Sequence, residues 1–191
     1  MPELQGKGHV YRSPIVRLRQ EFNLRTNLRP CKAYTGNPLN YRDDLDLVVF
    51  RQNTEGLYAG LEWTNPPKQV VEAFATHPKW KAFADTPVGD LAISTRVFTR
   101  NACRRIVRAA FEYADKFGYK SVTVCEKPNV IRETSGMMEE EARKVHADFP
   151  DIQLWSTNID AQMMWLTKNP EDYGVIVSGN MFGDIVSDGF A

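Results

Sequence analysis

The stretch "YGVIVSGNMFGDIVSD" (Tyr173–Asp188) joins a short run rich in β-branched residues to a segment with two aspartates four positions apart. The run predicts a buried strand, and the segment "GDIVSD" predicts a helix directly after it. In open α/β sheets, ligands bind outside the carboxyl ends of the strands. The second half of this stretch is therefore expected to lie at a ligand-binding edge of a sheet.

The same alternation of strand and helix continues through most of the chain. Strands that alternate with amphipathic helices predict an α/β fold with a largely parallel sheet. The other expected strands are 44–51, 91–98, 121–127 and 152–155, and the other expected helices are 13–22, 101–118, 135–149 and 160–170. In helix 101–118 the apolar residues at helical spacing, before a terminal Gly118, are Ile106, Val107, Ala110, Phe111, Ala114 and Phe117.

Composition restricts the class of protein. The 191 residues carry 24 basic and 24 acidic side chains, and this balance gives no reason to expect nucleic acid or an anionic membrane as the main partner. No apolar run approaches the roughly 18 residues of a membrane span, and the N-terminus lacks the apolar stretch of a secretory signal. The three cysteines, Cys31, Cys103 and Cys125, form no CxxC pair, which favours a reduced, cytoplasmic compartment.

One segment breaks the alternation. Residues 62–90 hold four prolines and two tryptophans, and they are too rich in aromatic residues for a disordered linker. Two interpretations remain open: an arm that makes protein contacts, or an ordered surface loop.

Asp184 and Asp188 are the first candidate ligands. On a helix they would share one face about one turn apart, where their like charges repel. A hard divalent cation would remove that repulsion, because Mg²⁺ and Mn²⁺ take carboxylate oxygens. The simpler interpretation of this pair alone is two first-turn carboxylates that the helix dipole favours, since acidic pairs on helix faces are common.

Further polar residues follow two predicted strands. Arg51 and Tyr58 come after the strand that ends near residue 51, and Lys127 comes after the strand that ends near residue 126. A guanidinium suits a carboxylate, and a tyrosine can act as a general acid if a nearby cation such as a lysine lowers its pKa. The alternative is a polar turn with a surface tyrosine and a solvated lysine.

A predicted helix with Ser13 as its N-cap and Pro14 at its first position adds Arg19, and Arg29 follows. A helix N-terminus together with arginines makes an anion site. Arginines for carboxylates, aspartates for a metal and a tyrosine–lysine pair for proton transfer fit a metal-assisted reaction on a polycarboxylic acid.

Five blocks of the chain resemble, in family order, the isocitrate and 3-isopropylmalate dehydrogenase family, the metal-dependent decarboxylating β-hydroxyacid dehydrogenases. They extend from about Ser13 to the end of the chain, and five ordered blocks are more specific than any short motif. The blocks are "SPIVRLRQEFNLRTNLRP", "DLDLVVFRQNTEGLYAGLEW", "SVTVCEKPNVIRETSG", "NIDAQMMW" and "GNMFGDIVSD".

The resemblance implies a domain organisation. Residues 1–24 correspond to a helical segment of the family's large domain, and 25–191 to its small substrate-binding and dimer-forming domain, an α/β/α sandwich of the isopropylmalate-dehydrogenase-like fold. The excursion at about 59–98 falls where the family has its dimer clasp. Family members are much longer, so the chain is expected to be a central fragment or truncated product, inactive alone because most of the cofactor site is missing.

The resemblance also implies a reaction, the oxidative decarboxylation of a 2-hydroxy polycarboxylic acid with Mg²⁺ or Mn²⁺ and NAD or NADP. Lys127 would deprotonate the hydroxyl as hydride leaves for the nicotinamide, and Tyr58 would protonate the enol after CO₂ departs. Lys127 and Asp160 would come from the partner subunit of a homodimer. The residues implied to bind substrate are Ser13, Arg19, Arg29, Arg51 and Asn129, and those implied to bind the metal are Asp160, Asp184 and Asp188.

Ser13 resembles isocitrate enzymes, so the favoured reaction is isocitrate to 2-oxoglutarate. Three positions depart from the pattern: Ile15 stands where many isocitrate enzymes have asparagine, Gln52 where the family usually has glutamate, and Arg25 where tyrosine is common. Ile15 and Gln52 leave open homoisocitrate or isopropylmalate as the substrate. They also leave open a non-catalytic dimerisation or regulatory subunit of the same family.

Overall fold

The computed structural model describes residues 14–40 and 42–190. Its strands are β1 (Thr26–Lys32), β2 (Asp46–Gln52), β3 (Glu62–Thr64), β4 (Ala92–Ser94), β5 (Ser121–Glu126), β6 (Gln153–Asn158) and β7 (Val175–Ser178). Five of them form the main sheet in the order β1-β2-β7-β5-β6. The pairs β2–β7, β7–β5 and β5–β6 are parallel, and only β1 is antiparallel to its neighbour.

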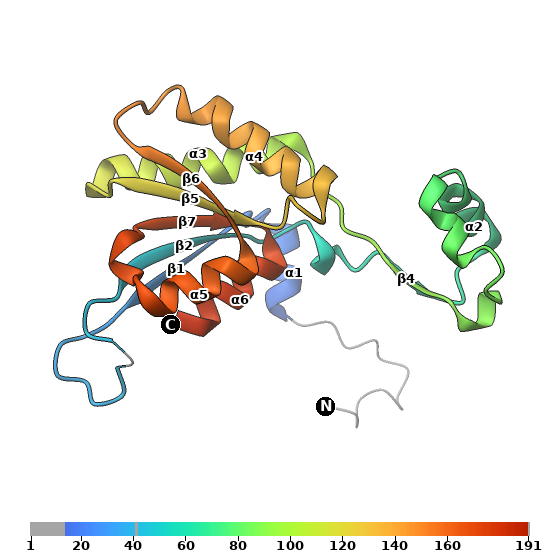
Figure 1. Ribbon diagram of the computed structural model, residues 1–191, viewed down its shortest axis with the longest axis horizontal. Coiled ribbons are helices and arrows are strands. Elements are labelled where there is room, and N and C mark those ends of the chain that lie inside the picture. The colour runs from blue at the N-terminus through green and yellow to red at the C-terminus, as the bar shows by residue number, and fades with distance from the viewer. Residues whose placement is uncertain (1–13, 41, 191) are drawn as a thin grey trace.

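Helices cover both faces of this sheet (Figure 1). The α-helices are α1 (Pro14–Glu21), α2 (Lys68–Ala75), α3 (Arg100–Phe117), α4 (Arg132–His146), α5 (Ile159–Lys168) and α6 (Asn180–Phe190). The 3-10 helices are η2 (Leu57–Ala59), η3 (Pro78–Phe83), η4 (Val88–Asp90) and η5 (Pro170–Asp172). One apolar core lies between the sheet and the pair α3 and α4, and a second between the sheet and the pair α5 and α6. The predicted α/β/α sandwich with a largely parallel sheet is confirmed.

The apolar pattern of α3 behaves as its sequence predicts, with one exception. Thr99 caps the helix by accepting a hydrogen bond from the Ala102 amide at 3.3 Å, and Gly118 ends it at a φ of 75°. Phe117 is 56% exposed, so the prediction that it belongs to the buried stripe is wrong. It lies in the last turn, where its ring packs on Tyr113 with centroids 4.3 Å apart instead of reaching the sheet.

Strand β1 was not expected from the sequence. Its burial alternates only weakly, and it contains Pro30, which lacks an amide hydrogen. The strand is possible because it lies at the edge of the sheet and pairs only with β2, where a proline can turn away from the ladder.

The strand expected over 91–98 is wrong in extent and in partner. Only β4 forms, and it pairs with β3 in a separate two-stranded ladder. The two ends of the excursion pair with each other instead: the Thr95 amide donates to the Leu61 carbonyl at 3.0 Å, and Val97 bridges Gly56. The excursion therefore forms an arm that contains β3, α2, η3, η4 and β4 and projects away from the main sheet (Figure 1).

Two findings bear on the expected compartment. All three cysteines are buried and free, and burial raises the pKa of Cys31 to about 11 and of Cys103 to about 12. Among residues 14–40 and 42–190, no helix is both long enough and apolar enough to cross a bilayer. The cytoplasmic location stays a prediction. The expected boundary between a large-domain segment (1–24) and the small domain (25–191) also stays a prediction.

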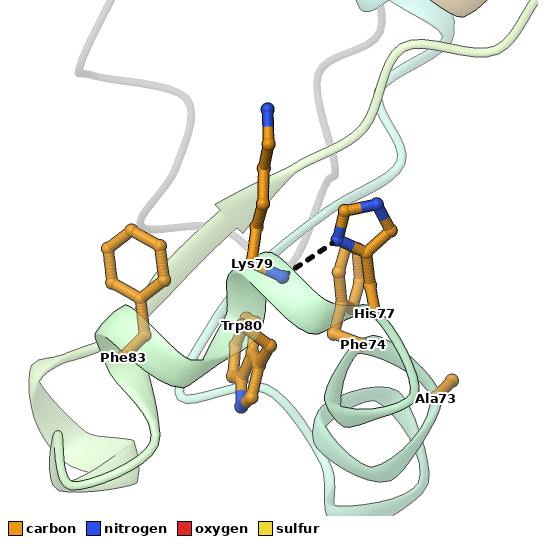
Figure 2. A pocket seen from close by; sticks show the side chains of 6 residues that line it. All are labelled: Ala73, Phe74, His77, Lys79, Trp80 and Phe83. Atoms are coloured by element: carbon orange, nitrogen blue, oxygen red, sulfur yellow. Dashed lines mark hydrogen bonds between the residues drawn. The ribbon is translucent and has the colours of Figure 1, made fainter.

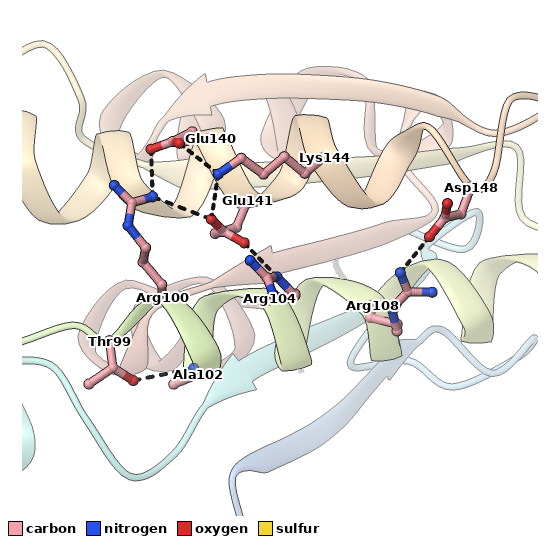
Figure 3. Close-up of polar contacts among 9 residues, drawn as sticks. All are labelled: Thr99, Arg100, Ala102, Arg104, Arg108, Glu140, Glu141, Lys144 and Asp148. Carbon is pink, nitrogen blue, oxygen red and sulfur yellow. Dashed lines mark hydrogen bonds and ion pairs between the residues drawn. The ribbon is translucent and has the colours of Figure 1, made fainter.

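A row of ion pairs joins α3 to α4 (Figure 3). Glu141 has no exposed surface and accepts hydrogen bonds from Arg104 at 2.8 Å, Lys144 at 2.9 Å and Arg100 at 3.3 Å. Glu140 beside it is more exposed and binds Arg100 and Lys144, each at 2.7 Å. Because Glu141 is buried, its carboxylate needs these cations to replace lost water.

We expect Glu141→Gln to lower the free energy of unfolding at pH 7 by about 1–3 kcal/mol, because the buried side chain loses its charge and would turn a donating NH₂ group towards cationic donors. Lys144 and Arg104 hold the pKa of Glu141 below its ordinary value, and Lys144 and Arg100 hold that of Glu140 at about 2. A carboxylate whose pKa is lower in the folded state than in the unfolded state stabilises the fold above about pH 4.5, the ordinary glutamate pKa. This stabilisation is lost as the pH falls through the folded-state pKa. Urea unfolding from pH 7 to pH 2 should therefore show a flatter acid limb in Glu141→Gln than in the wild type. Equal slopes would contradict the assignment.

Candidate active site

The candidate site lies at the edge of the sheet where β2, β7 and β5 end. Arg51 and Ser178 are paired across β2 and β7 at this edge, and α6 begins directly after the turn at Gly179. Helix α6 packs closely on β2 here: a side chain at Gly183 would place its Cβ 2.9 Å from the Cβ of Arg51. The glycine thus allows α6 to bring its aspartates to the end of β2.

Arg51 is the buried centre of this cluster, with 3% exposure. Its Nε donates a hydrogen bond to the Asn180 side-chain oxygen at 2.9 Å, and its Nη1 pairs with Asp184. Its guanidinium lies 5.4 Å from the centre of the Tyr58 ring. A guanidinium removed from water needs such contacts, because an unpaired buried charge is strongly destabilising.

Arg29 reaches the same helix from β1. It donates to the Ser187 hydroxyl at 2.9 Å, forms an ion pair with Asp188, and lies 3.4 Å from Asp184. Two arginines from two strands therefore meet the aspartates of one helix face.

Arg19, on α1, is half-buried and contributes charge to the cluster. Burial lowers the pKa of Arg51; Asp184 opposes this effect, whereas the positive charges of Arg29 and Arg19 add to it. The three arginines predicted to bind carboxylates are thus close enough to influence one another. Ser13, the other predicted substrate ligand on this side, lies outside the described residues.

The structure corrects one expectation for Asp184 and Asp188. Helix α6 begins at Asn180 and has no acidic residue in its first turn. The interpretation as first-turn carboxylates favoured by the helix dipole is therefore wrong. Their charges are balanced by Arg29 and Arg51 instead.

The structure also corrects the expected pKa shift of Tyr58. Its hydroxyl donates to Asp184 at 3.2 Å, and desolvation together with that carboxylate raises its pKa. The charge of Arg51 lowers the pKa by a smaller amount. A phenol in this setting keeps its proton at neutral pH, and it is a proton donor.

Lys127 forms an ion pair with Asp160, which follows the parallel strand β6. The hydrogen bond from Lys127 lowers the pKa of Asp160. Among the described residues, no hydrogen bond or ion pair joins Lys127 to Tyr58. Within one chain, Lys127 is therefore not the cation beside that tyrosine. Asn129, the remaining predicted substrate ligand, is exposed in the loop between β5 and α4.

The predicted metal ligands divide into two groups. Asp184 and Asp188 lie together on α6, whereas Asp160 is held by Lys127 at the start of α5. Within residues 14–40 and 42–190, no three acidic, histidine or cysteine side chains gather closely enough to hold a metal. The donor atoms of α6 fit a hard cation in kind, because they are carboxylate oxygens at a charged sheet edge. A single chain therefore brings together two of the three predicted metal ligands, Asp184 and Asp188.

Gln52, the departure from glutamate, has a structural role here. Its side-chain oxygen accepts from the backbone amides of Thr54 at 3.1 Å and Glu55 at 2.8 Å, and its amide donates to the Thr54 hydroxyl at 2.9 Å. It is 2% exposed and shapes the turn that leads to Tyr58. The neutral amide of Gln52 satisfies the hydrogen-bonding groups of this turn, so glutamine at this position does not disrupt the cluster.

Several residues of the site were not found from the sequence. Asn180 and Ser187 orient the arginines. Glu126 is fully buried beside Lys127. One signal was available, because Glu126 is a charged residue at the end of an otherwise neutral, predominantly apolar strand.

The fold and the cluster define an α/β domain with a charged sheet edge built from arginines, aspartates and a tyrosine. A family model described as isocitrate/isopropylmalate dehydrogenase matches residues 1–191. The chain therefore belongs to the isocitrate/isopropylmalate dehydrogenase family.

Relatives named for both substrates are similar to this chain. A 3-isopropylmalate dehydrogenase of Methanothermobacter thermautotrophicus is 40% identical over 174 residues, which are 91% of this chain and 46% of that protein. A mitochondrial NAD isocitrate dehydrogenase catalytic subunit of Arabidopsis thaliana is 37% identical over 183 residues, 96% of this chain and 42% of that protein. The crystal structure of isocitrate dehydrogenase from Methylococcus capsulatus superposes with a TM-score of 0.80 at 36% identity, covering 97% of this chain and 49% of that one. The chain thus spans less than half the length of each of these relatives.

Proposed function

We propose that this chain carries the substrate- and metal-binding part of an enzyme that oxidatively decarboxylates a 2-hydroxy polycarboxylic acid, with isocitrate to 2-oxoglutarate as the favoured reaction. The observation that carries the proposal is the cluster in which Arg29 and Arg51 meet Asp184 beside the Tyr58 hydroxyl. Membership of the dehydrogenase family supports the reaction class. The preference for isocitrate rests on the resemblance at Ser13.

The arginines are suited to a substrate with several carboxylates. A guanidinium binds a carboxylate through two parallel hydrogen bonds, which sets orientation as well as affinity. Arg29 and Arg51 now bind Asp184 and Asp188. A polycarboxylate that took over these contacts would leave aspartate oxygens available to a cation, so substrate and cation are expected to strengthen each other's binding.

Asp184 and Asp188, together with the partner subunit's Asp160, would hold Mg²⁺ or Mn²⁺, which supplies Lewis-acid polarisation of the hydroxyl and keto oxygens. Lys127 would accept the hydroxyl proton as hydride leaves for NAD or NADP, and it can do so only in its neutral form, so it must leave Asp160 before it acts. Tyr58 would donate a proton to the enol carbon after CO₂ departs. Desolvation and Asp184 raise its pKa in the single chain, so this role requires a cation of the assembled site, such as the metal or the partner subunit's Lys127, to lower it.

The proposed site needs a homodimer, because Asp160 and Lys127 lie apart from the aspartates of α6 within one chain. The arm offers a surface for this contact. An open apolar hollow of about 560 Å³ lies on it, lined by α2 and η3, and Figure 2 shows Phe74, Trp80 and Phe83 around it. Phe83 is 52% exposed, and exposed aromatic clusters of this kind mark protein interfaces.

We expect the chain to sediment as a dimer at micromolar concentration, and we expect Phe83→Ser to shift it towards monomer. Removing the exposed ring deletes apolar contact area in the dimer, while it removes little from the fold of one chain. Leu39→Ser is the control, because Leu39 is 89% exposed on a loop outside the arm. A wild-type chain that remains monomeric would contradict both the arm contact and the shared site.

A turnover assay tests the reaction itself. The complete gene product is supplied with Mn²⁺, NAD or NADP, and isocitrate, isopropylmalate or homoisocitrate in turn. We expect reduction of the nicotinamide with release of CO₂ for one of these acids, isocitrate first. Binding of an acid without turnover would favour the alternative, a non-catalytic dimerisation or regulatory subunit, for which the departures at Ile15 and Gln52 are the motivation.

A further inference from the structure

Glu126 is a fully buried carboxylate that lies next to the proposed catalytic lysine without facing the substrate arginines. Its Oε2 accepts hydrogen bonds from Arg96 at 2.6 Å and from the Ser135 hydroxyl at 2.8 Å. Its Oε1 accepts from the backbone amide of Gly179 at 2.7 Å. Both oxygens are therefore committed to donors from three separate segments.

Only a carboxylate satisfies this arrangement. A glutamine has one accepting oxygen and one donating NH₂ group. In either orientation the NH₂ group would face a donor, Arg96 on one side or the Gly179 amide on the other. Glu126 is thus required as an anion that accepts on both sides.

Arg96 brings the arm into this network. It lies on the segment that returns from β4 to α3, its side chain is only 12% exposed, and it also donates to Thr134 at 3.2 Å. Its guanidinium is sandwiched by aromatic rings, 4.4 Å from the centre of Phe98 and 5.0 Å from that of Phe182. Phe182 belongs to α6, so Arg96 contacts both the carboxylate and the helix that carries the aspartates.

The network joins the Lys127 loop to the start of α6, the two parts that one chain would contribute to the two shared sites of the homodimer. On one side, Ser135 accepts from the Lys127 backbone amide at 3.3 Å, which ties the lysine loop to α4. On the other side, Glu126 holds Gly179 at the start of α6, one residue before Asn180. The approach is so close that a Cβ at Gly179 would lie 2.7 Å from the Glu126 Oε1 and 2.7 Å from the Phe98 ring.

We propose, on the basis of the proposed function, that Arg96 and Glu126 are positioning residues that fix the Lys127 loop and helix α6 of each chain relative to each other. In the proposed homodimer, the loop of one chain then meets helix α6 of its partner in the arrangement the reaction needs. Neither residue contacts the substrate arginines. They act through hydrogen bonds to Ser135 and Gly179. Because Arg96 lies where the arm returns to the main sheet, the network also links the proposed dimer contact to the site.

The test compares Glu126→Gln with Glu141→Gln in the complete gene product. Both glutamates have no exposed surface and bind arginine, but Glu141 lies between α3 and α4, away from the sheet edge. We expect Glu126→Gln to lower kcat by about 10–100-fold with KM for the acid changed less than about threefold, as for residues that orient catalytic groups. Glu141→Gln should lower thermal stability while kcat measured well below its Tm is unchanged.

A graded pair at position 96 keeps the proposal testable if Glu126→Gln folds poorly. Arg96→Lys retains the charge that pairs with Glu126 but loses the planar guanidinium that lies over the Phe98 and Phe182 rings, so kcat should fall less than in Arg96→Met. Equal kcat in all three variants and the wild type would overturn the positioning role, and so would a kcat loss in Glu141→Gln matching that in Glu126→Gln.

Amide hydrogen exchange separates this inference from the proposed function. We expect Glu126→Gln to accelerate exchange at Gly179 and around Lys127 without a comparable change in α3. This readout requires no turnover. If the wild type has no dehydrogenase activity, the proposed function fails while faster exchange at these two places still supports the network; unchanged exchange there overturns it.

Discussion

Lys127→Met in the complete gene product is expected to abolish hydride transfer. Without a base the substrate hydroxyl keeps its proton, and the carbonyl that must form as hydride leaves cannot develop. General acid–base groups contribute roughly 10²–10⁴ in rate, so turnover should fall by at least that factor while affinity for the acid changes little. Stopped-flow measurement of nicotinamide reduction in a single turnover checks this directly.

Tyr58→Phe is the matched variant, because it removes one oxygen from the other proposed proton-transfer residue. We expect it to act after hydride transfer, on decarboxylation and enol protonation. The variant should therefore still reduce the free keto acid, oxalosuccinate if isocitrate is the substrate, while overall turnover falls. Near-native turnover in both variants would contradict the assignment of the pair. Loss of affinity alone in both would favour the non-catalytic subunit.

Asp184→Asn and Asp188→Asn are expected to weaken Mn²⁺ binding by about tenfold or more each, since even residues that orient metal ligands contribute this much. The two variants should differ in stability. Asp184 pairs with the buried Arg51 and is 25% exposed, whereas Asp188 is 69% exposed and pairs with Arg29 at the surface. Asp184→Asn should therefore also lower the free energy of unfolding, by about 1–3 kcal/mol, and Asp188→Asn should change it little.

Calorimetry with Mn²⁺, with and without isocitrate, measures the first effect, and urea unfolding without metal measures the second. In the wild type, isocitrate should tighten Mn²⁺ binding, and this coupling should be lost in both variants. Unchanged metal affinity in both would remove Asp184 and Asp188 from the proposed metal site. They would then serve only as counter-charges of Arg29 and Arg51.

Local patterns in the sequence were sufficient for the architecture. The β-branched runs that became β2, β5 and β7 must be buried on both faces, and the apolar spacing of α3 and its terminal Gly118 define a helix that covers them. Such patterns report burial within one element, so they predicted an α/β fold with a largely parallel sheet. The order of the motifs gave the resemblance to the family, and that resemblance implied the α/β/α sandwich, substrate binding by Arg19, Arg29 and Arg51, and metal binding by Asp184.

Contacts between distant segments depended on the folded chain, because no local pattern encodes them. Strand β1 forms at the edge of the main sheet despite Pro30, because β2 provides a partner for it on one side. Residues 91–98 do not form a strand of the main sheet, because β4 pairs with β3 at the other end of the arm. The pKa of Tyr58 rises because folding removes water from its hydroxyl and places Asp184, 126 residues away, against it. Glu126 is buried as an anion only because Arg96, Ser135 and Gly179 converge on it from three segments. Hydrogen bonds and contact ion pairs of this kind need groups within a few ångströms of each other in space, so they follow from the packing of the elements and not from their order along the chain.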